Sequence, residues 1–363
     1  MGDVAERVER LLDEAEQECR CAFARRPQEG SRLRRLYAAG ELVRPLRGLY
    51  IRAKTWRRLS VAERHLSIVR GLSRRHPDWV FCDVSAALLL GLECPEAELD
   101  TVHVAVEYGS LAHRIPGLVR HEIDIRRARL VDGVPTLVAD DLLFGCIRRL
   151  GFEDGLALAD SALRVLGVAK EHLVSLFERG HKGCRGIRVA RVVASQADAR
   201  SENGGESKVR ARLFELNRVV PELQVTFANP DGLGWYRVDY LWRLPTGDLV
   251  AGELDGKAKY RDFEMTGGRS EEEVRAAQAL RDDRLERQGV RVMHFTFEQA
   301  MDPLAFPALL REFGIPMREV GEPNVDVIMT PRLPCIDHPR KQRFRVVAGY
   351  RDAGLEVVML EAA

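Results

Sequence analysis

Apolar residues recur at helical spacing near the start of the chain. The segment 4–24 keeps one apolar side over several turns and predicts a first helix. Pro27 and Gly30 then interrupt the pattern, as these residues do between helices. The following stretch, "SRLRRLYAAG", offers Ser31 as an N-cap and Gly40 as the residue beyond the last turn, so it predicts a second helix.

Two short β-prone pieces around Pro45, in "ELVRPLRGLYIR", follow the second helix and predict a hairpin. A helix followed by a small basic hairpin is the layout of a winged helix, in which the helix enters a groove of DNA and the hairpin holds phosphates. We therefore expect residues 1–75 to be a DNA-binding region. The candidate DNA contacts are Arg32, Arg34 and Arg35 on the helix and Arg44, Arg47 and Arg52 on the hairpin.

Residues 76–194 mix strand and helix patterns and predict an α+β middle domain. "DWVFCDVSAALLLGL" begins as a strand and continues as a helix, and "TVHVAVEYG" alternates as a strand does. We find no catalytic spacing here and interpret His103, His113 and His121 as ordinary structural or surface histidines. The polar stretch 195–205 has no apolar periodicity and predicts a linker.

The third block of the chain carries most of the candidate chemistry. A helical stretch, "ESKVRARLFELNRVV", precedes three strand-like ones, "ELQVTFA", "YRVDYLWRL" and "DLVAGELDG". A long charged helix, "SEEEVRAAQALRDDRLERQGV", and a last strand in "RVMHFTFEQA" complete the order helix–strand–strand–strand–helix–strand. We predict an α/β sandwich over 206–318. The Pro-rich, basic tail 319–363 has no assigned role.

The turn "PTGD" decides which residues of the second and third strands face each other. A two-residue loop would place Asp239 and Glu253 on opposite faces of the hairpin, because side chains alternate along a strand. A three-residue loop over 245–247 would pair Asp239 directly with Glu253. Gly247 would then take the left-handed position of such a turn. We predict the three-residue loop, or a bulge with the same effect.

The predicted register would bring Asp239 and Glu253 close together on neighbouring strands, which costs free energy unless something compensates their charges. Asp239 lies inside a strand, where aspartate is disfavoured, and close carboxylates repel each other unless a cation or a shared proton lies between them. Mg²⁺, or Mn²⁺ in its place, is the usual answer, since carboxylates, waters and phosphate oxygens hold it and it can polarise a phosphodiester. Glu206 would assist Asp239 and Glu253, and Lys257 or Lys259 would stabilise the developing charge.

Each of these residues also has an ordinary structural interpretation. Asp239 can cap a turn or pair with a neighbouring arginine, and Asp255 can be an Asp-Gly turn residue. The two lysines can be solvated, and Glu206 can be a first-turn acid that the helix dipole favours. The combination is more specific than any one member.

The overall composition suits a soluble globular protein. The chain has 363 residues, 45% of them hydrophobic and 31% charged, and we find no charge-free stretch long enough for a membrane span. Its acidic, periodic start lacks the basic and apolar regions of a signal peptide. The seven cysteines are scattered and odd in number, which is typical of reduced thiols. We therefore expect a cytoplasmic protein without a membrane partner.

The net charge of +1 conceals a strong asymmetry. Residues 1–19 hold seven acids and two bases, whereas residues 20–75 hold sixteen Lys or Arg and three Glu. A basic segment this dense inside a nearly neutral chain indicates contact with a polyanion, and we expect DNA. A solvated basic helix surface is the alternative.

With these residues in view, the C-terminal block resembles a known family. "ESKVRARLFELNRVVPELQVTF", "YRVDYLW", "LVAGELDGKAKY" and "RDDRLERQGVRVMHFTFEQ" are similar to the Vsr-like (very-short-patch-repair-like) branch of the PD-(D/E)XK nuclease superfamily. The resemblance covers residues 206–300 and implies a restriction-endonuclease-like sandwich with Mg²⁺-dependent deoxyribonuclease activity. It implies that Asp239 and Glu253 bind the metal and that Glu206 assists.

One position departs from the superfamily's pattern. A lysine stands two residues after the second acid in the superfamily, and Asp255 occupies that place here. Either Lys257 or Lys259 supplies the amine from a shifted position, or Asp255 is a further metal ligand. If neither holds, the domain binds DNA without cutting it. Arg275 and Arg281 are further candidates for pairing with a phosphate or an acid.

The N-terminal part also resembles a known family. "AAGELVRPLRGLYI" and "DVSAALLLGL…DTVHVAV" are similar to the winged-helix antitoxin-like region of abortive-infection systems. Together the two resemblances imply a multi-domain α/β protein that docks on DNA by a winged helix and hydrolyses phosphodiester bonds with Mg²⁺ or Mn²⁺. The alternative is a non-catalytic, antitoxin-like transcriptional regulator whose nuclease domain is degenerate.

Overall fold

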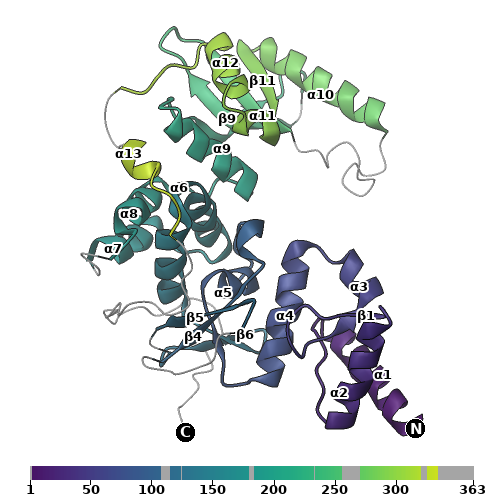
Figure 1. Cartoon of the computed structure of the whole chain (residues 1–363). Helices are drawn as coiled ribbons and strands as arrows, with labels where there is room; N and C mark the ends of the chain where they lie inside the picture. The colour runs from purple at the N-terminus through teal and green to yellow at the C-terminus, as the bar shows by residue number, and fades with distance from the viewer. Residues whose placement is uncertain are drawn as a thin grey trace. The chain divides into compact units, whose positions relative to one another are not determined.

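The structure, a computed structural model, describes residues 2–107, 115–123, 125–179, 184–232, 234–255, 270–319 and 325–333. The chain divides into two compact units (Figure 1). Unit 1 takes in Met1–Arg149 and Ser175–Ile187, and unit 2 takes in Leu150–Val174 and Arg188–Arg332. Both contain helices and sheets, so the predicted multi-domain α/β class is confirmed, while the five-segment division of the sequence stays a prediction. Among the described residues, no helix combines the length and the apolar character that crossing a membrane requires.

Two amphipathic helices pack together at the start of unit 1. Helix α1 (Gly2–Gln17) buries Val8, Leu11 and Leu12, and helix α2 (Pro27–Ala38) adds Leu33 to the same cluster. Helix α1 ends earlier than the sequence pattern predicts. The chain turns away at Cys19, which has a φ of 49°.

The second helix begins four residues before the predicted start. Pro27 lies in its first turn, where a missing N–H costs nothing, and Glu29 accepts hydrogen bonds from the backbone N–H groups of Arg25 and Arg26. The prediction of Ser31 as the N-cap is therefore wrong, because the proline starts the helix instead of preceding it. Ser31 Oγ instead donates to the Pro27 carbonyl.

A short antiparallel hairpin follows around Pro45, as predicted. Farther along the chain, unit 1 contains a five-stranded sheet in the order β5-β4-β3-β7-β6, in which β4 and β5 run parallel. The elements are β1 (Leu42–Val43), β2 (Ile51–Arg52), α3 (Ala53–Arg58), α4 (Val61–Arg75), β3 (Val80–Phe81), α5 (Asp83–Leu89), the 3₁₀ turn η1 (Glu96–Glu98), β4 (Val102–Val106), β5 (Leu118–Glu122), β6 (Arg129–Val131) and β7 (Val134–Thr136).

Helices link these strands to the elements of unit 2, where the predicted order helix–strand–strand–strand–helix–strand is confirmed. The chain continues through α6 (Ala139–Val165), which is kinked at Gly151, α7 (Lys170–Arg179) and α8 (Ile187–Gln196). Unit 2 continues with α9 (Gly204–Glu215), β8 (Glu222–Ala228), β9 (Trp235–Arg243), β10 (Leu249–Asp255), α10 (Glu271–Glu286), β11 (Val290–Thr296), α11 (Phe297–Met301), α12 (Ala305–Glu312) and α13 (Val325–Ile328).

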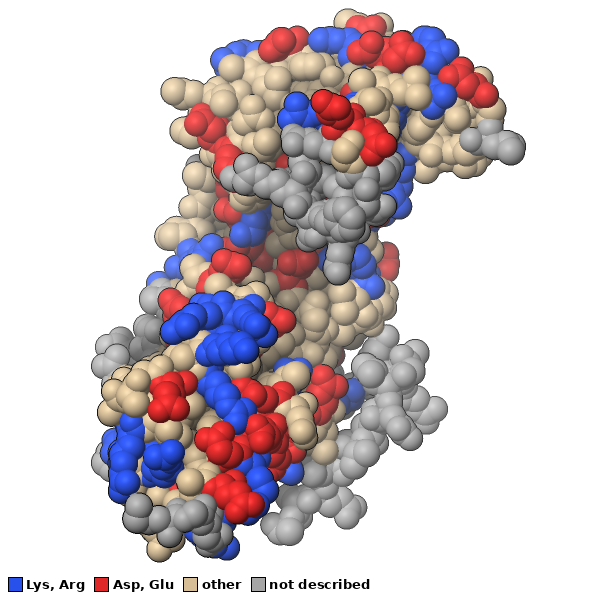
Figure 2. All heavy atoms as spheres, turned by 90° about the vertical axis from the view of Figure 1, so that its right-hand side faces the viewer, with Lys and Arg blue, Asp and Glu red and all other residues tan. Residues whose placement is uncertain are grey.

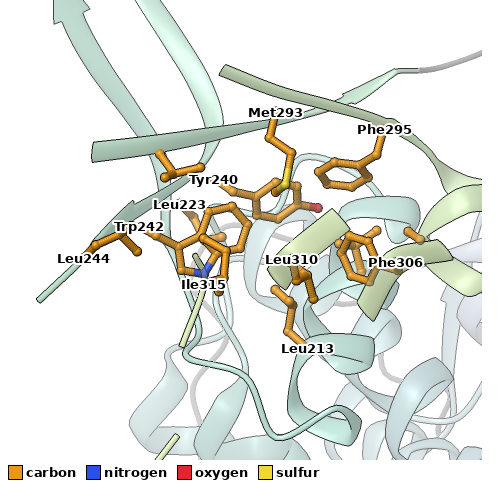
Figure 3. Close-up of a cluster of buried hydrophobic side chains, with 13 residues drawn as sticks. Leu213, Leu223, Tyr240, Trp242, Leu244, Met293, Phe295, Phe306, Leu310 and Ile315 are labelled. Atoms are coloured by element: carbon orange, nitrogen blue, oxygen red, sulfur yellow. The ribbon is translucent and has the colours of Figure 1, made fainter. Parts of the chain in front are cut away.

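The sheet of unit 2 is covered by helices on both faces. Its order is β11-β10-β9-β8; β9 runs antiparallel to both neighbours and β11 parallel to β10. On one face, Tyr240, Trp242 and Phe295 pack with residues of α9, α11 and α12 (Figure 3). On the other, Leu285 of α10 packs against Leu241 and its neighbours. The sheet is therefore rigidly supported where β9 and β10 carry the predicted acids.

Candidate active site

The turn between β9 and β10 is the three-residue loop that the sequence predicts. The N–H of Leu244 donates to the carbonyl of Asp248 over 2.9 Å, and the N–H of Gly247 donates back to the carbonyl of Leu244 over 2.9 Å. Gly247 has a φ of 93°, which residues with a side chain rarely adopt. The turn therefore fixes how the two strands pair.

The register that this turn sets runs up to the two acids. Tyr240 pairs with Gly252, as the predicted register requires, and regular pairing ends there, one position before Asp239 and Glu253. The predicted register is thus confirmed as far as this pair, and the facing of the two carboxylates stays a prediction. A β-carbon at Gly252 would lie 2.8 Å from the ring of Trp242. Glycine at this position therefore lets the ring pack against the strand directly beside Glu253.

Asp239 lies where the sheet is distorted. Regular pairing between β9 and β10 ends at Tyr240, and Asp239 Oδ2 accepts a hydrogen bond from the backbone N–H of Leu254 over 3.0 Å. On the other side, Gln224 of β8 lies opposite Asp239 and has a φ of 54°. The carboxylate of Asp239 is thus held at the point where two strands part.

Glu253 is buried and paired with an arginine of α10. Arg281 Nη2 donates to Glu253 Oε1 over 2.6 Å and to the carbonyl of Arg237 over 2.5 Å. The expectation that Arg281 pairs with an acid is confirmed. Its guanidinium offsets the charge of Glu253 at one of the two carboxylate oxygens.

Glu206 lies in the first turn of α9 and is also buried. Its carboxylate accepts hydrogen bonds from Asn203 Nδ2 (2.7 Å), the backbone N–H of Glu202 (2.8 Å) and Gln224 Nε2 (3.1 Å). Burial, and to a smaller extent the charge of Asp239, raise the pKa of Glu206 to about 7. Both interpretations of Glu206 therefore have support, because it is an acid in the first turn of its helix and also lies within electrostatic reach of a second acid.

Asp255, in the place of the superfamily's lysine, lies beside a histidine. His294 Nδ1 is 3.4 Å from Asp255 Oδ2, and His294 Nε2 is 2.9 Å from Asp282 Oδ2. Hydrogen bonds with Asp255 and then with Asp282 raise the pKa of His294 to about 9, so the ring carries a positive charge at neutral pH. Lys257 and Lys259 lie outside the described residues, and their assignment stays a prediction.

The acids of unit 2 do not form a tight triad. Within the described part of the chain, one group of three His, Cys, Asp or Glu side chains has all its ligand atoms within 4.8 Å of one another, and it consists of Asp83, His103 and His121 in unit 1. Two of these residues were interpreted as ordinary histidines, and His113 lies outside the described residues. No metal-ligand spacing in the sequence connects the three positions.

The predicted DNA contacts of the N-terminal part differ in exposure. Arg34, Arg35, Arg44 and Arg47 are exposed, whereas Arg32 is half-buried. Arg44 lies over the ring of Tyr37, 4.9 Å from its centre. The exposed arginines are accessible for phosphate contacts, as the sequence interpretation requires.

Arg52 is engaged within the chain. Its Nη2 lies 2.9 Å from Glu9 and 2.8 Å from Asp13, and its Nη1 lies 2.6 Å from Glu16, all on α1. Figure 2 shows acidic and basic side chains gathered next to one another over the N-terminal elements. The acidic helix thus neutralises the one hairpin arginine that contacts it, and a DNA contact by Arg52 stays a prediction.

Comparisons with known proteins add two relatives. No family model matches the chain, and no solved structure matches it. It is similar to two curated proteins of Mycobacterium tuberculosis, "Uncharacterized protein MT2308" of strain CDC 1551 and "Uncharacterized protein Rv2248" of strain H37Rv. Each is 28% identical over 163 residues, which are 45% of this chain and 58% of the relative. The chain thus spans less than two thirds of the length of the relatives it matches, and their names state no activity.

Proposed function

We propose that unit 2 contains a Mg²⁺-dependent deoxyribonuclease site of the Vsr-like, PD-(D/E)XK kind, and that a winged helix at the N-terminus docks the protein on DNA. The element order of α9 to β11 and the helices on both faces of the sheet support a restriction-endonuclease-like fold. The observation that carries the proposal is that the pairing of β9 and β10 ends next to both Asp239 and Glu253, where the backbone N–H of Leu254 on β10 donates to the carboxylate of Asp239.

The donor chemistry of this pair fits the proposed ion. Mg²⁺ binds hard oxygen ligands and needs only one or two protein carboxylates, because waters and phosphate oxygens complete its shell. Asp239 and Glu253 would hold the ion. Asp255, the last residue of β10, already lies beside the charged ring of His294. When bound, Mg²⁺ would supply Lewis-acid polarisation of a phosphodiester.

Two cationic side chains of the chain lie beside the acids. Either could supply the positive charge that the superfamily's lysine provides, because Asp255 occupies the lysine's place here. Arg281 contacts Glu253, and His294 contacts Asp255. A guanidinium binds phosphate oxygens well and stays charged at all relevant pH values. We therefore assign charge stabilisation to Arg281, with Lys257 and Lys259 as the predicted alternatives.

Glu206 has an assisting role in this proposal. A group that moves protons in a reaction works best when its pKa lies close to the working pH, and the pKa of Glu206 is raised to about 7. Its three hydrogen bonds fix the orientation of the carboxyl group. A proton held at Glu206 Oε1 or Oε2 would then lie within electrostatic reach of Asp239.

Cleavage of supercoiled plasmid DNA with Mg²⁺ or Mn²⁺ tests the proposal. We expect the wild-type chain to cut, and Glu253→Gln and Asp239→Asn to lower the rate by at least about 100-fold. Asp248→Asn is the matched control, because it removes an exposed acid from the turn of the same hairpin. Equal cleavage by the wild type and Glu253→Gln, or metal-independent cleavage by both, would reject the assignment.

A second function, a non-catalytic DNA-binding regulator, is favoured by one observation. Glu253 and Asp255 each have a cationic partner within the chain, as members of a structural ion-pair network do. This function predicts DNA binding that weakens steeply with salt, without metal-dependent cleavage.

Variants of the hairpin arginines separate DNA docking from cleavage. Arg44→Gln combined with Arg47→Gln should weaken DNA binding and reduce its salt dependence, because two phosphate contacts are lost. Arg243→Gln is the control, since it removes an exposed arginine of β9 to which no DNA contact is assigned. Binding that is unchanged in the double variant would contradict docking through the hairpin, whatever the cleavage assay shows.

A further inference from the structure

Three separate segments of unit 1 bring an aspartate and two histidines together. His103 lies on β4, His121 lies on β5, and Asp83 opens α5 directly after β3 (Figure 1). Ala105 lies opposite His121 in the parallel pairing of β4 and β5. Because alternate residues of a strand share a face, His103 and His121 are diagonal neighbours on one face of the sheet.

The distances between these side chains are close to those of a metal site. His103 Nδ1 is 2.9 Å from His121 Nε2, and the two ring planes are inclined by 22°. A carboxylate oxygen of Asp83 completes a group whose ligand atoms all lie within 4.8 Å of one another. Tetrahedral zinc with bonds of about 2.0–2.1 Å places two ligand atoms about 3.3 Å apart. Small side-chain shifts therefore suffice to admit an ion.

The charges around Asp83 favour a cation. Arg149 donates from Nε to Asp83 Oδ2 (2.9 Å) and from Nη2 to Asp83 Oδ1 (2.5 Å), and its Nη1 donates to Glu98 Oε2 (2.5 Å). One guanidinium is thus shared by two carboxylates, the buried Asp83 and the 19% exposed Glu98, so it does not belong to Asp83 alone.

We propose that Asp83, His103 and His121 bind a divalent transition-metal ion, with Zn²⁺ as the best match. Imidazole nitrogens and a carboxylate oxygen are ligands that zinc accepts, and three protein ligands leave its fourth position to water or a bound molecule. Mg²⁺ prefers oxygen ligands only. The site therefore differs in residues and in chemistry from the acids of unit 2, and it does not depend on the proposed nuclease function.

Neighbouring groups hold the ligands in place, as they do in known metal sites. Arg149 fixes the carboxylate of Asp83 through both oxygens. The backbone N–H of His103 donates to Ser85 Oγ over 2.9 Å, and His65 Nε2 lies 2.8 Å from the same hydroxyl. The side chain of Ser85 thus ties the strand at His103 to α5 and α4.

The full-length chain, stripped of metal with a chelator, tests the proposal by titration with Zn²⁺ and with Co²⁺. We expect Zn²⁺ binding that His121→Gln weakens at least about 100-fold, since a ligand matters at least as much as the groups that orient it. His294→Gln, which alters a histidine of unit 2 between two aspartates, should bind Zn²⁺ as the wild type does. The Co²⁺ spectrum should be that of a tetrahedral nitrogen–oxygen site.

The cobalt spectrum also separates these ligands from nearby thiols. Cys94 and Cys146 lie within electrostatic reach of Asp83, and a thiolate ligand would give a strong charge-transfer band in the near ultraviolet. Such a band would overturn the proposal, as would a wild-type chain that takes up no Zn²⁺ at micromolar concentration. Unchanged binding in both His121→Gln and Asp83→Asn would also overturn it. Circular dichroism of the metal-free variants checks that they fold. If a variant does not fold, the Co²⁺ spectrum of the wild-type chain decides whether the proposal stands.

Discussion

The two candidate metal sites differ in how their acids are neutralised. In unit 2, Glu253 has a contact from one nitrogen of Arg281, whose side chain is 25% exposed. In unit 1, Asp83 is held through both oxygens by Arg149, whose side chain is 8% exposed. A partly exposed arginine that holds one carboxylate oxygen can give way to a ligand, whereas a buried arginine that holds both oxygens of a carboxylate is part of the support. An arginine–carboxylate pair thus leaves the acid open to a metal ion in unit 2 and fixes the position of the acid in unit 1.

The largest effect on stability should come from the buried pair. Arg149→Gln removes both hydrogen bonds to Asp83 and leaves its carboxylate in a buried place, which typically costs about 3–5 kcal/mol. Urea unfolding followed by circular dichroism measures the loss. Arg10→Gln, which breaks an exposed pair with Glu6, should cost less than about 0.5 kcal/mol. If the free energy of unfolding fell by less than about 1 kcal/mol in Arg149→Gln, other groups would balance the charge of Asp83. The pair in unit 1 would then be no stronger a support than the pair Arg281–Glu253 in unit 2.

The pH dependence of stability reports on the acids of unit 2. Folded Glu206 keeps its proton to about pH 7, whereas an unfolded glutamate loses it near 4.5. The folded state therefore binds more protons between these values, and the free energy of unfolding falls as pH rises through this window. The full difference corresponds to about 3 kcal/mol. Glu206→Gln should flatten the fall, and Glu222→Gln, an exposed acid of β8, should not. A wild-type profile that is flat from pH 4.5 to 7 would contradict the raised pKa.

The two sites should also respond to opposite variants. Glu253→Gln should lower Mg²⁺-dependent cleavage by at least about 100-fold, equal to about 2.7 kcal/mol, and leave Zn²⁺ binding unchanged. His121→Gln should weaken Zn²⁺ binding at least about 100-fold and leave Mg²⁺-dependent cleavage unchanged. Both are measured on the same preparations by plasmid nicking and metal titration. If either variant lost both properties, the two sites would not be independent.

The strand pairing beside the acids of unit 2 could be predicted because local chemistry fixes it. The three-residue turn with Gly247 determines the register, which holds as far as Tyr240 and Gly252, next to Asp239 and Glu253. The start of α2 was mispredicted for an equally local reason, since Pro27 can begin a helix as well as interrupt one. The detail that pattern alone did not supply is the irregular backbone at Gln224, where the sheet is distorted opposite Asp239.

The Asp83 cluster shows where sequence reasoning stops. His103 and His121 meet because β4 and β5 pair in parallel, and parallel strands need a connecting segment whose length does not set the register. Asp83 joins them from the end of a third strand, with a φ of 50° that no sequence pattern predicts for aspartate. Each residue alone has an ordinary interpretation. Only the fold brings their ligand atoms within 4.8 Å of one another.

The smallest effect should come from the partly exposed arginine of unit 2. Arg281→Gln removes the ion pair with Glu253 and the hydrogen bond to the Arg237 carbonyl, and should cost about 1–3 kcal/mol, because a buried carboxylate oxygen loses a donor. Arg287→Gln, which changes the 49% exposed residue directly after α10, is the matched control. Since Mg²⁺ would take over the compensation of Glu253, added Mg²⁺ should restore more stability to Arg281→Gln than to the wild type. A thermal-unfolding series with and without Mg²⁺ measures this difference. If Mg²⁺ stabilised the wild type and Arg281→Gln equally, Arg281 and Mg²⁺ would not compete for the carboxylate of Glu253.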